Sequence, residues 1–309
     1  MNNNSKIYVA GHTGLVGSAL VRALRRRGHD NLLLRTHADL DLCDQAATRQ
    51  FFANERPEYV LVAAARVGGI LVNSRNQAEF LLQNLQIAGN VIESAHKGGA
   101  KKLLFLGSSC VYPRGAAQPI TEDALLTGAL EPSNEGYAIA KIAGLKLCEY
   151  YNRQHGADFI SAMPCNLYGP NDNFDPDGSH LIPALLRRFH EAKLSGASCV
   201  TLWGSGTPLR EFLYADDLAE ACLLLMEKYS GAQTVNIGSG DEHSVAETAR
   251  LAARAVGYTG ALAFDRENPD GMPRKLMDSG RMRALGWRPQ TSLQEGLRRA
   301  YEHYAGACL

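Results

Sequence analysis

The chain has 309 residues, 45% of them hydrophobic and 21% charged, and its 32 basic residues balance its 32 acidic residues. This length leaves room for two domains or one large one, and the composition is ordinary for a soluble globular protein with a sizeable core. Because the formal net charge is zero, the sequence argues against a nucleic-acid binder that works by neutralising phosphates.

Neither a targeting segment nor a membrane span stands out in the sequence. The opening stretch MNNNSKIYVAG has no long apolar region, so we expect no signal peptide. No apolar run approaches the roughly 18–20 residues that cross a bilayer. Seven scattered cysteines form no CxxC pair: Cys43, Cys110, Cys148, Cys165, Cys199, Cys222 and Cys308. Their odd number and spacing predict reduced thiols in a cytoplasmic protein without structural zinc.

The first half of the chain alternates short apolar runs with longer amphipathic ones. We expect strands over residues 6–11, 31–35, 58–65, 101–109 and 158–164. Helical spacing predicts helices over residues 15–28, 78–99 and 135–156, the first with Gly28 as its stop. Apolar strands separated by helices predict an α/β fold with a parallel sheet that is buried on both faces.

After Pro164 the character of the sequence changes. Residues 166–180, NLYGPNDNFDPDGSH, are rich in Gly, Pro, Asn and Asp and predict a loop. Helix-like and strand-like pieces then mix without strict alternation, which predicts a smaller C-terminal α/β lobe. We therefore expect one domain over 1–168, joined by a return segment at 214–240, and a substrate-binding lobe over 169–213 and 241–309.

Three glycines lie between the first expected strand and the first expected helix. Gly11, Gly14 and Gly17 form a G-x-x-G-x-x-G pattern. Glycine allows a tight turn there and lets the backbone approach a pyrophosphate at the start of the helix. The alternative is a plain turn, but the position between strand and helix favours a Rossmann-type doubly wound sheet that binds a dinucleotide.

The end of the second strand bears on which dinucleotide is bound. Folds specific for NAD often carry an acidic residue there, whereas this chain has Arg35 and His37, which suit the 2′-phosphate of NADP. The alternative for Arg35 is a solvated strand end. Asp41 and Leu42 could line the adenine pocket, and the alternative for Asp41 is to cap the next helix.

Tyr137 and Lys141 are four residues apart in an expected helix, so they share one face. The pKa of a free tyrosine, about 10, is too high for easy proton exchange at neutral pH, and a nearby ammonium would lower it. Tyr137 is therefore a candidate general acid/base and Lys141 its tuning partner. With the glycine turn and with Ser108 at the end of the fourth strand, coincidence becomes a poor explanation.

Together, the three glycines, Ser108 and the Tyr137/Lys141 pair resemble the extended short-chain dehydrogenase/reductase family. The resemblance implies a nicotinamide dinucleotide in the first lobe and a nucleotide-sugar in the second. Ser108 and Tyr137 would hold the oxygen of a sugar carbonyl or alcohol. By this resemblance NADP(H) would be bound by Gly11, His12, Thr13, Gly14, Leu15, Val16, Gly17, Arg35, His37, Asp41, Leu42, Leu106, Gly107, Ser108, Ser109, Lys141, Pro164, Cys165, Asn166, Leu167 and His180.

Cys110 follows Ser108 in the stretch GSSCVYP. If the extended backbone continues, both side chains point to the same side. The stretches GSSCVYP, NLYGPNDNF and WGSGTPLREF are similar to those of family members that invert C3 and C5 of a GDP-4-keto sugar and then reduce C4. The resemblance implies that Cys110 is the base and His180 the acid of the inversion. The alternatives are a small buried apolar residue for Cys110 and a cap or core histidine for His180.

The second lobe contains further matches to the same family. Its substrate-contacting positions are Arg188, Trp203, Arg210 and Asp270 here. The planar donor fork of Arg210 suits a diphosphate, and Trp203 could pack on the nucleotide. The alternatives are a solvated helix face for Arg188 and a core aromatic for Trp203. The neighbouring pair Asp216 and Asp217 is interpreted as a helix cap rather than a catalytic pair.

One departure affects the cofactor preference. Some members have arginines where Thr13 and His37 stand here, so we expect NADPH to be preferred less strictly. A nucleotide-sugar 4-epimerase and a non-catalytic dinucleotide sensor are the other functions considered. The sensor should have lost Tyr137 or Lys141, and both are present. By analogy with the family we also expect a homodimer that pairs through the two long helices.

Overall fold

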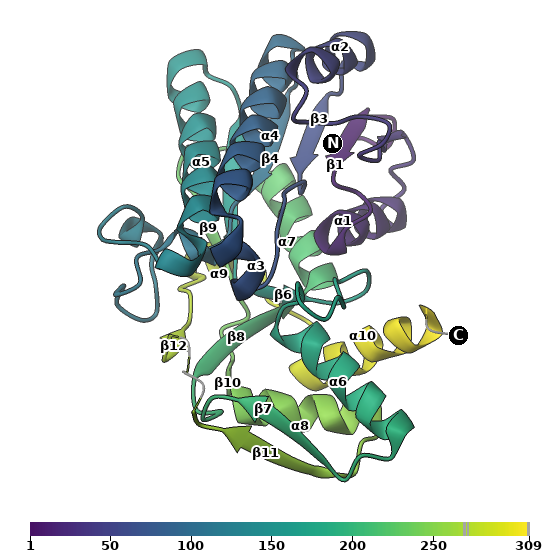
Figure 1. The fold of residues 1–309 in the computed structure, drawn as a ribbon. Helices are drawn as coiled ribbons and strands as arrows, with labels where there is room; N and C mark the ends of the chain where they lie inside the picture. The colour runs from purple at the N-terminus through teal and green to yellow at the C-terminus, as the bar shows by residue number, and fades with distance from the viewer. Residues whose placement is uncertain (268–269, 271, 308–309) are drawn as a thin grey trace.

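The computed structural model of the chain describes residues 1–267, 270 and 272–307. Figure 1 shows two lobes, with a layered sheet-and-helix lobe above and a smaller mixed lobe below. Among the described residues, no helix combines the length and the apolar character needed to cross a bilayer. Six cysteines are unpaired thiols, while Cys308 lies outside the described residues.

Six strands of the described chain form the upper sheet, all of them parallel, in the order β2-β1-β3-β4-β5-β9. They are β1 (Ile7–Ala10), β2 (Leu32–Leu33), β3 (Tyr59–Val62), β4 (Lys102–Leu106), β5 (Phe159–Pro164) and β9 (Val235–Ile237). Every residue of β1, β4 and β5 is buried, which explains their continuous apolar sequences. The chain changes direction between β1 and β3, and sheets of this kind bind ligands beyond the carboxyl ends of their strands at that point.

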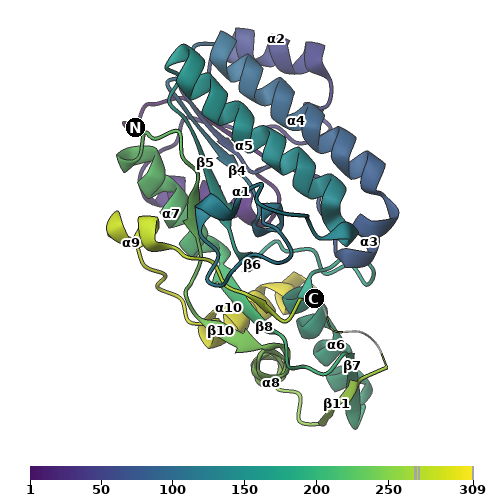
Figure 2. The same cartoon turned by 90° about the vertical axis from the view of Figure 1, so that its left-hand side faces the viewer.

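Helices cover both faces of this sheet, which confirms the doubly wound α/β fold. Figures 1 and 2 show one helical layer made of α2 (Gln45–Glu55), α4 (Gln77–Lys97) and α5 (Glu135–His155). The other layer is made of α1 (Leu15–Arg26) and α7 (Ala215–Lys228). The sequence predicts α2 only as the helix that follows Asp41, without bounds, and it does not predict the short α3 (Ile70–Arg75).

Two local features of the upper lobe correct the interpretation of acidic residues. Helix α2 is capped by Asp44, whose carboxylate accepts from the Ala47 N–H at 3.0 Å, so the alternative of Asp41 as the cap is wrong. Helix α7 has Tyr214 at its N-cap position and no side-chain cap. The capping interpretation of Asp216 and Asp217 is therefore wrong as well.

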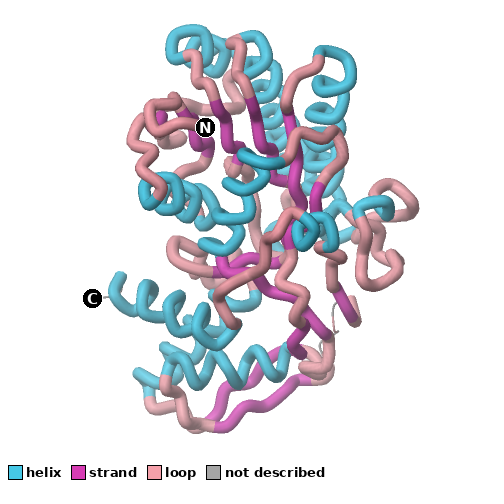
Figure 3. Tube along the Cα trace, turned by 180° about the vertical axis from the view of Figure 1, so that it is seen from behind, coloured by secondary structure: helices cyan, strands magenta, loops and turns pink. Residues whose placement is uncertain are grey.

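The lower lobe contains two small sheets and four helices among the described residues. Its strands are β6 (Asn166–Tyr168), β7 (Cys199–Trp203), β8 (Leu209–Tyr214), β10 (Glu242–Ser244), β11 (Ala261–Asp265) and β12 (Arg274–Lys275). Strand β8 pairs with β10, β12 and β6, while β11 pairs with β7. The helices are α6 (Leu181–Ser195), α8 (Val245–Val256), α9 (Gly280–Ala284) and α10 (Leu293–Ala307), of which α9 packs back against β9 of the upper sheet and buries Met282 in the upper core. Seen from behind, helices lie beside the lower strands (Figure 3).

Each lobe has its own hydrophobic core. The upper core is formed by the sheet and the helices on both of its faces, with Phe105 and Leu145 as members. The lower core contains Leu186, Phe189 and Leu297 from α6 and α10. Three short 3₁₀ helices, η1 (Ser109–Val111), η2 (Glu122–Ala124) and η3 (Pro132–Asn134), lie between β4 and α5.

Candidate active site

The turn between β1 and α1 uses glycine at positions where a side chain would not fit. Gly11 has φ +80°, in the left-handed region, and a Cβ there would lie 2.8 Å from backbone atoms of Ala64. A Cβ on Gly17 would lie 2.0 Å from the carbonyl oxygen of Gly11. Gly14 is the N-cap of α1 and brings no capping side chain. The helix start therefore presents backbone N–H groups at the point where the sheet changes direction, which suits an anion.

Two basic side chains follow β2. One is paired with a carboxylate, and the other is exposed to solvent. The Arg35 guanidinium pairs with Glu55 at 3.0 Å and lies 5.7 Å from the centre of the Phe51 ring. Arg35 is therefore a paired, half-buried residue rather than a solvated strand end. The His37 side chain is 85% exposed, and its Nδ1 is 3.7 Å from an oxygen of Asp41.

The carboxyl ends of β4 and β5 bring together the residues expected along the cofactor. Leu106 ends β4 and Pro164 ends β5, and the N–H of Gly107 donates to the Ala162 carbonyl at 2.8 Å between them. The neighbouring Cys165 is buried and its N–H donates to Ile237 at 3.0 Å. These residues lie at the carboxyl-terminal ends of the strands, as the glycine turn does, because the strands are parallel.

Lys141 lies inside the protein, next to the carboxyl-terminal end of β4. It is 4% exposed, and its ammonium donates to the carbonyl of Leu106 at 2.7 Å. The same nitrogen is 4.8 Å from the centre of the Phe105 ring and 5.8 Å from that of Tyr137. Burial lowers the pKa of Lys141 to about 8, although the nearby Cys110 opposes this shift. Helix α5 therefore directs Lys141 towards the end of β4 as the four-residue spacing predicts.

Tyr137 differs from the expectation that Lys141 lowers its pKa. Burial raises the pKa of the phenol, the nearby Cys110 raises it further, and a hydrogen bond with Ser108 opposes the increase. The Lys141 ammonium donates to the carbonyl of Leu106 rather than to the phenol. In this state Tyr137 is a protonated phenol, which is the form that a proton donor needs.

Ser108 and Cys110 are close together, but not for the reason given by the sequence. Strand β4 ends at Leu106, and residues 109–111 form the 3₁₀ helix η1, so the extended backbone does not continue. The turn itself brings the Ser108 hydroxyl 3.2 Å from the Cys110 sulfur, and the hydroxyl also accepts from the Cys110 N–H at 3.4 Å. Cys110 is half-buried and has a polar partner, which is more than packing requires.

His180 lies in the other lobe, at the start of α6. It occupies the N-cap position, but its side chain makes no capping bond. The ring is accessible to solvent, yet surrounding protein atoms desolvate it and lower the pKa of its imidazole. The alternatives of a capping or a core histidine are therefore both wrong, and the side chain is available for another purpose.

Arg210 and Asp270 come together in the lower lobe. The Asp270 carboxylate accepts from the Ser205 N–H at 2.9 Å and from its hydroxyl at 2.6 Å. These bonds, followed by the attraction of Arg210, hold the pKa of Asp270 below its usual value. Burial lowers the pKa of Arg210, and Asp270 opposes this shift. Asp270 lies against Gly204, and Arg210 is near enough for the two charges to attract each other.

Trp203 and Arg188 are on different elements of the lower lobe. Trp203 ends β7 and is 60% exposed, so the alternative of a core aromatic is wrong. Arg188 is half-buried on α6. An exposed indole next to the Arg210/Asp270 pair offers a flat surface for an aromatic base.

Three acidic residues near the predicted sites have structural partners. Asp216 forms a two-bond pair with Arg22 of α1, both bonds being 3.0 Å long. Asp217 accepts from the N–H groups of Gln290 and Thr291 and thereby holds the segment before α10. Glu211 is a fully buried carboxyl that sequence reasoning missed. Its oxygens accept from Gly240 and Met277, while burial raises its pKa to about 7.

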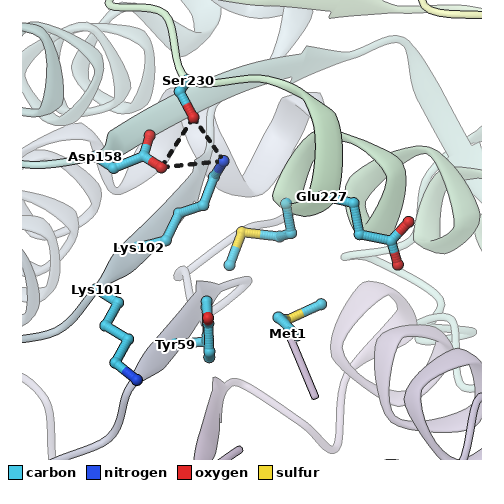
Figure 4. A pocket seen from close by; sticks show the side chains of 8 residues that line it. Met1, Tyr59, Lys101, Lys102, Asp158, Glu227 and Ser230 are labelled. Atoms are coloured by element: carbon cyan, nitrogen blue, oxygen red, sulfur yellow. Dashed lines mark hydrogen bonds and ion pairs between the residues drawn. The ribbon is translucent and has the colours of Figure 1, made fainter.

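A pocket of about 380 Å³ lies away from these residues, at the opposite edge of the sheet. Figure 4 shows Tyr59, Lys101 and Lys102 there, at the beginnings of β3 and β4. The Lys102 ammonium is 3.2 Å from Asp158 and 3.3 Å from the Ser230 hydroxyl. These polar groups are ion-paired or hydrogen-bonded with one another, whereas the candidate catalytic residues are at the other ends of the strands.

Comparison with known proteins places this geometry in a family. The model of the NAD dependent epimerase/dehydratase family matches residues 7–238. The chain is 58% identical over 303 residues to GDP-L-fucose synthase 1 of Arabidopsis thaliana, covering 98% of this chain and 94% of that protein. It is 50% identical over 311 residues to GDP-L-fucose synthase of Escherichia coli K12, covering 98% and 97%.

A solved structure agrees with the sequence comparisons. The GDP-L-fucose synthetase of Naegleria fowleri, bound to NADP, superposes with a TM-score of 0.93 at 30% identity, covering 100% of this chain and 95% of that one. The glycine turn, the Ser108/Tyr137/Lys141 cluster and the two-lobe fold thus occur in a chain whose relatives match it almost from end to end. The chain belongs to the NAD dependent epimerase/dehydratase family.

Proposed function

We propose that this chain converts GDP-4-keto-6-deoxy-D-mannose to GDP-L-fucose, by inverting C3 and C5 of the sugar and then reducing C4 with NADPH. The observation that carries the proposal is the thiol of Cys110, 3.2 Å from the Ser108 hydroxyl and beside Tyr137 and Lys141. Reduction alone needs no thiol at this position. The relatives that are 58% and 50% identical are named for this activity.

The residues around the glycine turn fit NADP(H). Because a Cβ on Gly11 or Gly17 would meet backbone atoms, no side chain at these positions covers the start of α1, and Nδ1 of the neighbouring His12 is buried without a hydrogen-bond partner. The N-terminus of α1 would hold the pyrophosphate, while Arg35 and His37 would face the 2′-phosphate. When bound, the nicotinamide supplies the hydride that reduces C4.

Ser108 and Tyr137 hold the oxygen on C4 in this mechanism. The two hydroxyl groups lie within hydrogen-bonding reach of each other, so one sugar oxygen can accept from both when it replaces their present partners. Tyr137, protonated because of its raised pKa, gives its proton to this oxygen during reduction. The Lys141 ammonium, near the Tyr137 ring, then stabilises the phenolate that remains.

Cys110 and His180 carry out the inversions before reduction. The C4 ketone acidifies the hydrogens on C3 and C5, and the Cys110 thiolate removes one of them as a proton. The resulting enolate oxygen is stabilised by Ser108 and Tyr137. His180 returns a proton from the opposite face, and the depressed pKa of its imidazole makes the imidazolium a stronger acid. No electrons leave or enter the sugar in these steps.

The decisive experiment is a single incubation with GDP-4-keto-6-deoxy-D-mannose and NADPH in deuterated water. We expect GDP-L-fucose that carries deuterium at C3 and C5, identified by NMR and mass spectrometry. A nucleotide-sugar 4-epimerase would exchange neither hydrogen and would consume no NADPH. A dinucleotide sensor would release no product at all. Either of these results would refute the proposal.

The division into domains is also part of the proposal. The NADP-binding domain spans 1–168 with 214–240, and the substrate lobe spans 169–213 with 241–309. Pairing of β9 with β5 and packing of α7 on α1 support the return segment. Phe189 and Leu297 in the separate lower core support the second lobe.

We further propose a homodimer in the cytoplasm. Helices α4 and α5 pack side by side and expose large apolar side chains, namely Leu82, Leu85, Ile139 and Tyr150. An apolar surface of this kind on two long helices suits a second copy of the same surface. The unpaired thiols of the described residues fit a reducing compartment.

A further inference from the structure

A short segment after β3 contacts two elements that carry proposed acid/base groups, the loop that precedes His180 and the start of α5. Residues 68–77, here called the bridging segment, include α3 and belong to the upper lobe. One end of the segment meets the loop that precedes His180, and the other end meets the start of α5, which carries Tyr137. Its position therefore affects the separation between the two lobes' catalytic residues.

At the first end, two backbones approach closely enough to exclude any side chain. The N–H of Gly69 donates to the carbonyl of Gly178 at 2.9 Å. A Cβ on Gly69 would lie 2.9 Å from the carbonyl oxygen of Ser179, the residue before His180. A shift of Gly69 would thus be passed directly to the backbone that carries the imidazole.

Asn73 holds Gly69 in this position. Its side chain is buried, with 8% of the residue exposed, and its amide nitrogen donates to the carbonyls of both Gly68 and Gly69, the second at 3.2 Å. Without the amide, the buried Gly68 carbonyl would lose this donor, while the Gly69 carbonyl would keep only the Asn73 backbone N–H at 3.0 Å. Asn73 does not itself touch the described catalytic residues, so any effect on chemistry must pass through the Gly68–Gly69 backbone.

At the other end, Gln77 fixes the start of α5. Its amide oxygen accepts from the N–H of Gly136 at 3.2 Å, and its amide nitrogen donates to Pro132 at 3.0 Å. Gly136 immediately precedes Tyr137. The bridging segment is therefore attached to the Tyr137 helix at one end and to the His180 loop at the other.

We propose that Asn73 is a positioning residue for His180, which it keeps at the correct separation from Cys110 and Tyr137 through Gly69. This inference rests on the proposed function, in which His180 returns a proton to the sugar. Displacement of a catalytic group by about 1 Å can cost around a hundredfold in rate, so loss of the Asn73 bonds should slow inversion. Reduction should change little, because its groups are on β4, η1 and α5.

The test compares two reactions of the same full-length variants. Inversion is measured as deuterium uptake at C3 and C5 of GDP-4-keto-6-deoxy-D-mannose with NADP⁺ present and no NADPH. Hydride transfer is measured as oxidation of GDP-L-fucose by NADP⁺ in a single turnover. Asn73→Ala is expected to lower deuterium uptake at least about tenfold and to leave hydride transfer within about threefold. Asn73→Asp keeps the shape of the side chain but removes the donor, so it should lower deuterium uptake in the same way. This variant provides the test if Asn73→Ala folds poorly.

Asn76→Ala is the matched control. It makes the same chemical change at the end of the same helix, where the Asn76 amide donates only to Val72 at 2.8 Å. It should leave both rates unchanged. The double variant Asn73→Ala/His180→Gln should be no slower in deuterium uptake than His180→Gln alone, since Asn73 acts through His180.

Each outcome separates the two proposals. If the wild type takes up no deuterium, the proposed function fails. If the wild type exchanges and folded Asn73→Ala and Asn73→Asp exchange equally fast, only the inference about Asn73 is overturned. Equal losses in exchange and hydride transfer would also overturn it, because they would indicate general loosening of the fold rather than positioning of His180.

Discussion

The two sides of the proposed active site are built differently. On the sheet side, Lys141 is buried with its ammonium 2.7 Å from the Leu106 carbonyl, and Ser108 is bonded to both Cys110 and Tyr137. On the side of the lower lobe, Trp203 is 60% exposed and His180 is accessible at the start of α6. The proposed groups of hydride transfer are thus fixed by the buried sheet, whereas the proposed proton donor His180 and the candidate nucleotide contact Trp203 remain open.

The largest effect should follow from removal of the proton donor on the sheet side. Tyr137→Phe keeps the ring but deletes the hydroxyl, so reduction of C4 is expected to fall about a thousandfold while the fold persists. NADPH oxidation at 340 nm measures the loss, and thermal unfolding checks the fold. Turnover near that of the wild type would show that another group protonates the C4 oxygen.

A somewhat smaller effect is expected for the groups of inversion, one from each side. Cys110→Ser should lower deuterium uptake at C3 and C5 about a hundredfold, because an alcohol is far less acidic than a thiol of pKa about 8.5. Hydride transfer should remain possible, which would yield some 6-deoxy sugar of the unchanged configuration. His180→Gln should also impair inversion. Full deuterium uptake by Cys110→Ser would show that the cysteine contributes only to packing.

On the recognition side, loss of one contact should weaken binding rather than chemistry. Arg210→Ala is expected to raise the dissociation constant of GDP about tenfold or more, since charge-assisted hydrogen bonds contribute about 1.5–3 kcal/mol. Isothermal titration with GDP measures the change, and single-turnover hydride transfer at saturation should stay close to that of the wild type. Arg187→Ala is a suitable control, because Arg187 pairs with Glu191 at 3.1 Å. Equal weakening by both variants would argue against a specific role for Arg210.

The pH dependence of NADPH use should report Lys141, which belongs to the sheet side of the proposed active site. Burial lowers the pKa of Lys141 to about 8, so its ammonium is present below that pH and is lost above it. We expect kcat/KM for NADPH to be level below pH 8 and to fall up to about tenfold per pH unit above it, since this ratio reports groups of the free enzyme. A level profile up to pH 10 would mean that Lys141 keeps its proton or is not needed.

Much of the sheet side was predictable from sequence because it depends on local rules. Continuous apolar runs predict buried parallel strands, and the four-residue spacing places Tyr137 and Lys141 on one face of α5. The closeness of Ser108 and Cys110 was also expected, although the cause is the turn of η1 rather than an extended strand. The pKa of Tyr137 was predicted in the wrong direction, because the burial that raises it is not visible in a motif.

The remaining features depend on contacts between distant segments. Asp217 was interpreted as a helix cap, yet it holds Gln290 and Thr291, more than 70 positions away. Glu211 lies next to Arg210 in β8, and only the fold shows that its carboxyl meets the N–H groups of Gly240 and Met277. The contact of Gly69 with Gly178 is of the same kind. Neither periodicity nor spacing reports such partners.

The smallest effect concerns the cofactor preference, and it follows from the pairing of Arg35. Glu55 lies 3.0 Å from Arg35 and also pairs with Lys6, so part of the positive charge expected to face a 2′-phosphate is already compensated. Exposed pairs of this sort contribute about 0.2–1 kcal/mol, which corresponds to at most a few-fold in affinity. We expect a modest preference for NADPH over NADH, a weaker one in Arg35→Ala, and a stronger one in Glu55→Gln.

The measurement is the ratio of kcat/KM for the two cofactors in each variant. Glu93→Gln serves as the control, because Glu93 pairs with Arg49 at 2.9 Å on α4, not at the end of β2. If Glu55→Gln left the ratio unchanged while Arg35→Ala lowered it, Arg35 would contact the phosphate without competition from Glu55. If neither variant changed it, the exposed His37 would be the remaining basic residue at this strand end, and His37→Ala would then have to lower the ratio. A wild type that prefers NADH would contradict the assignment, because Arg35 rather than an acidic residue stands directly after β2, where NAD-specific folds place an acidic one.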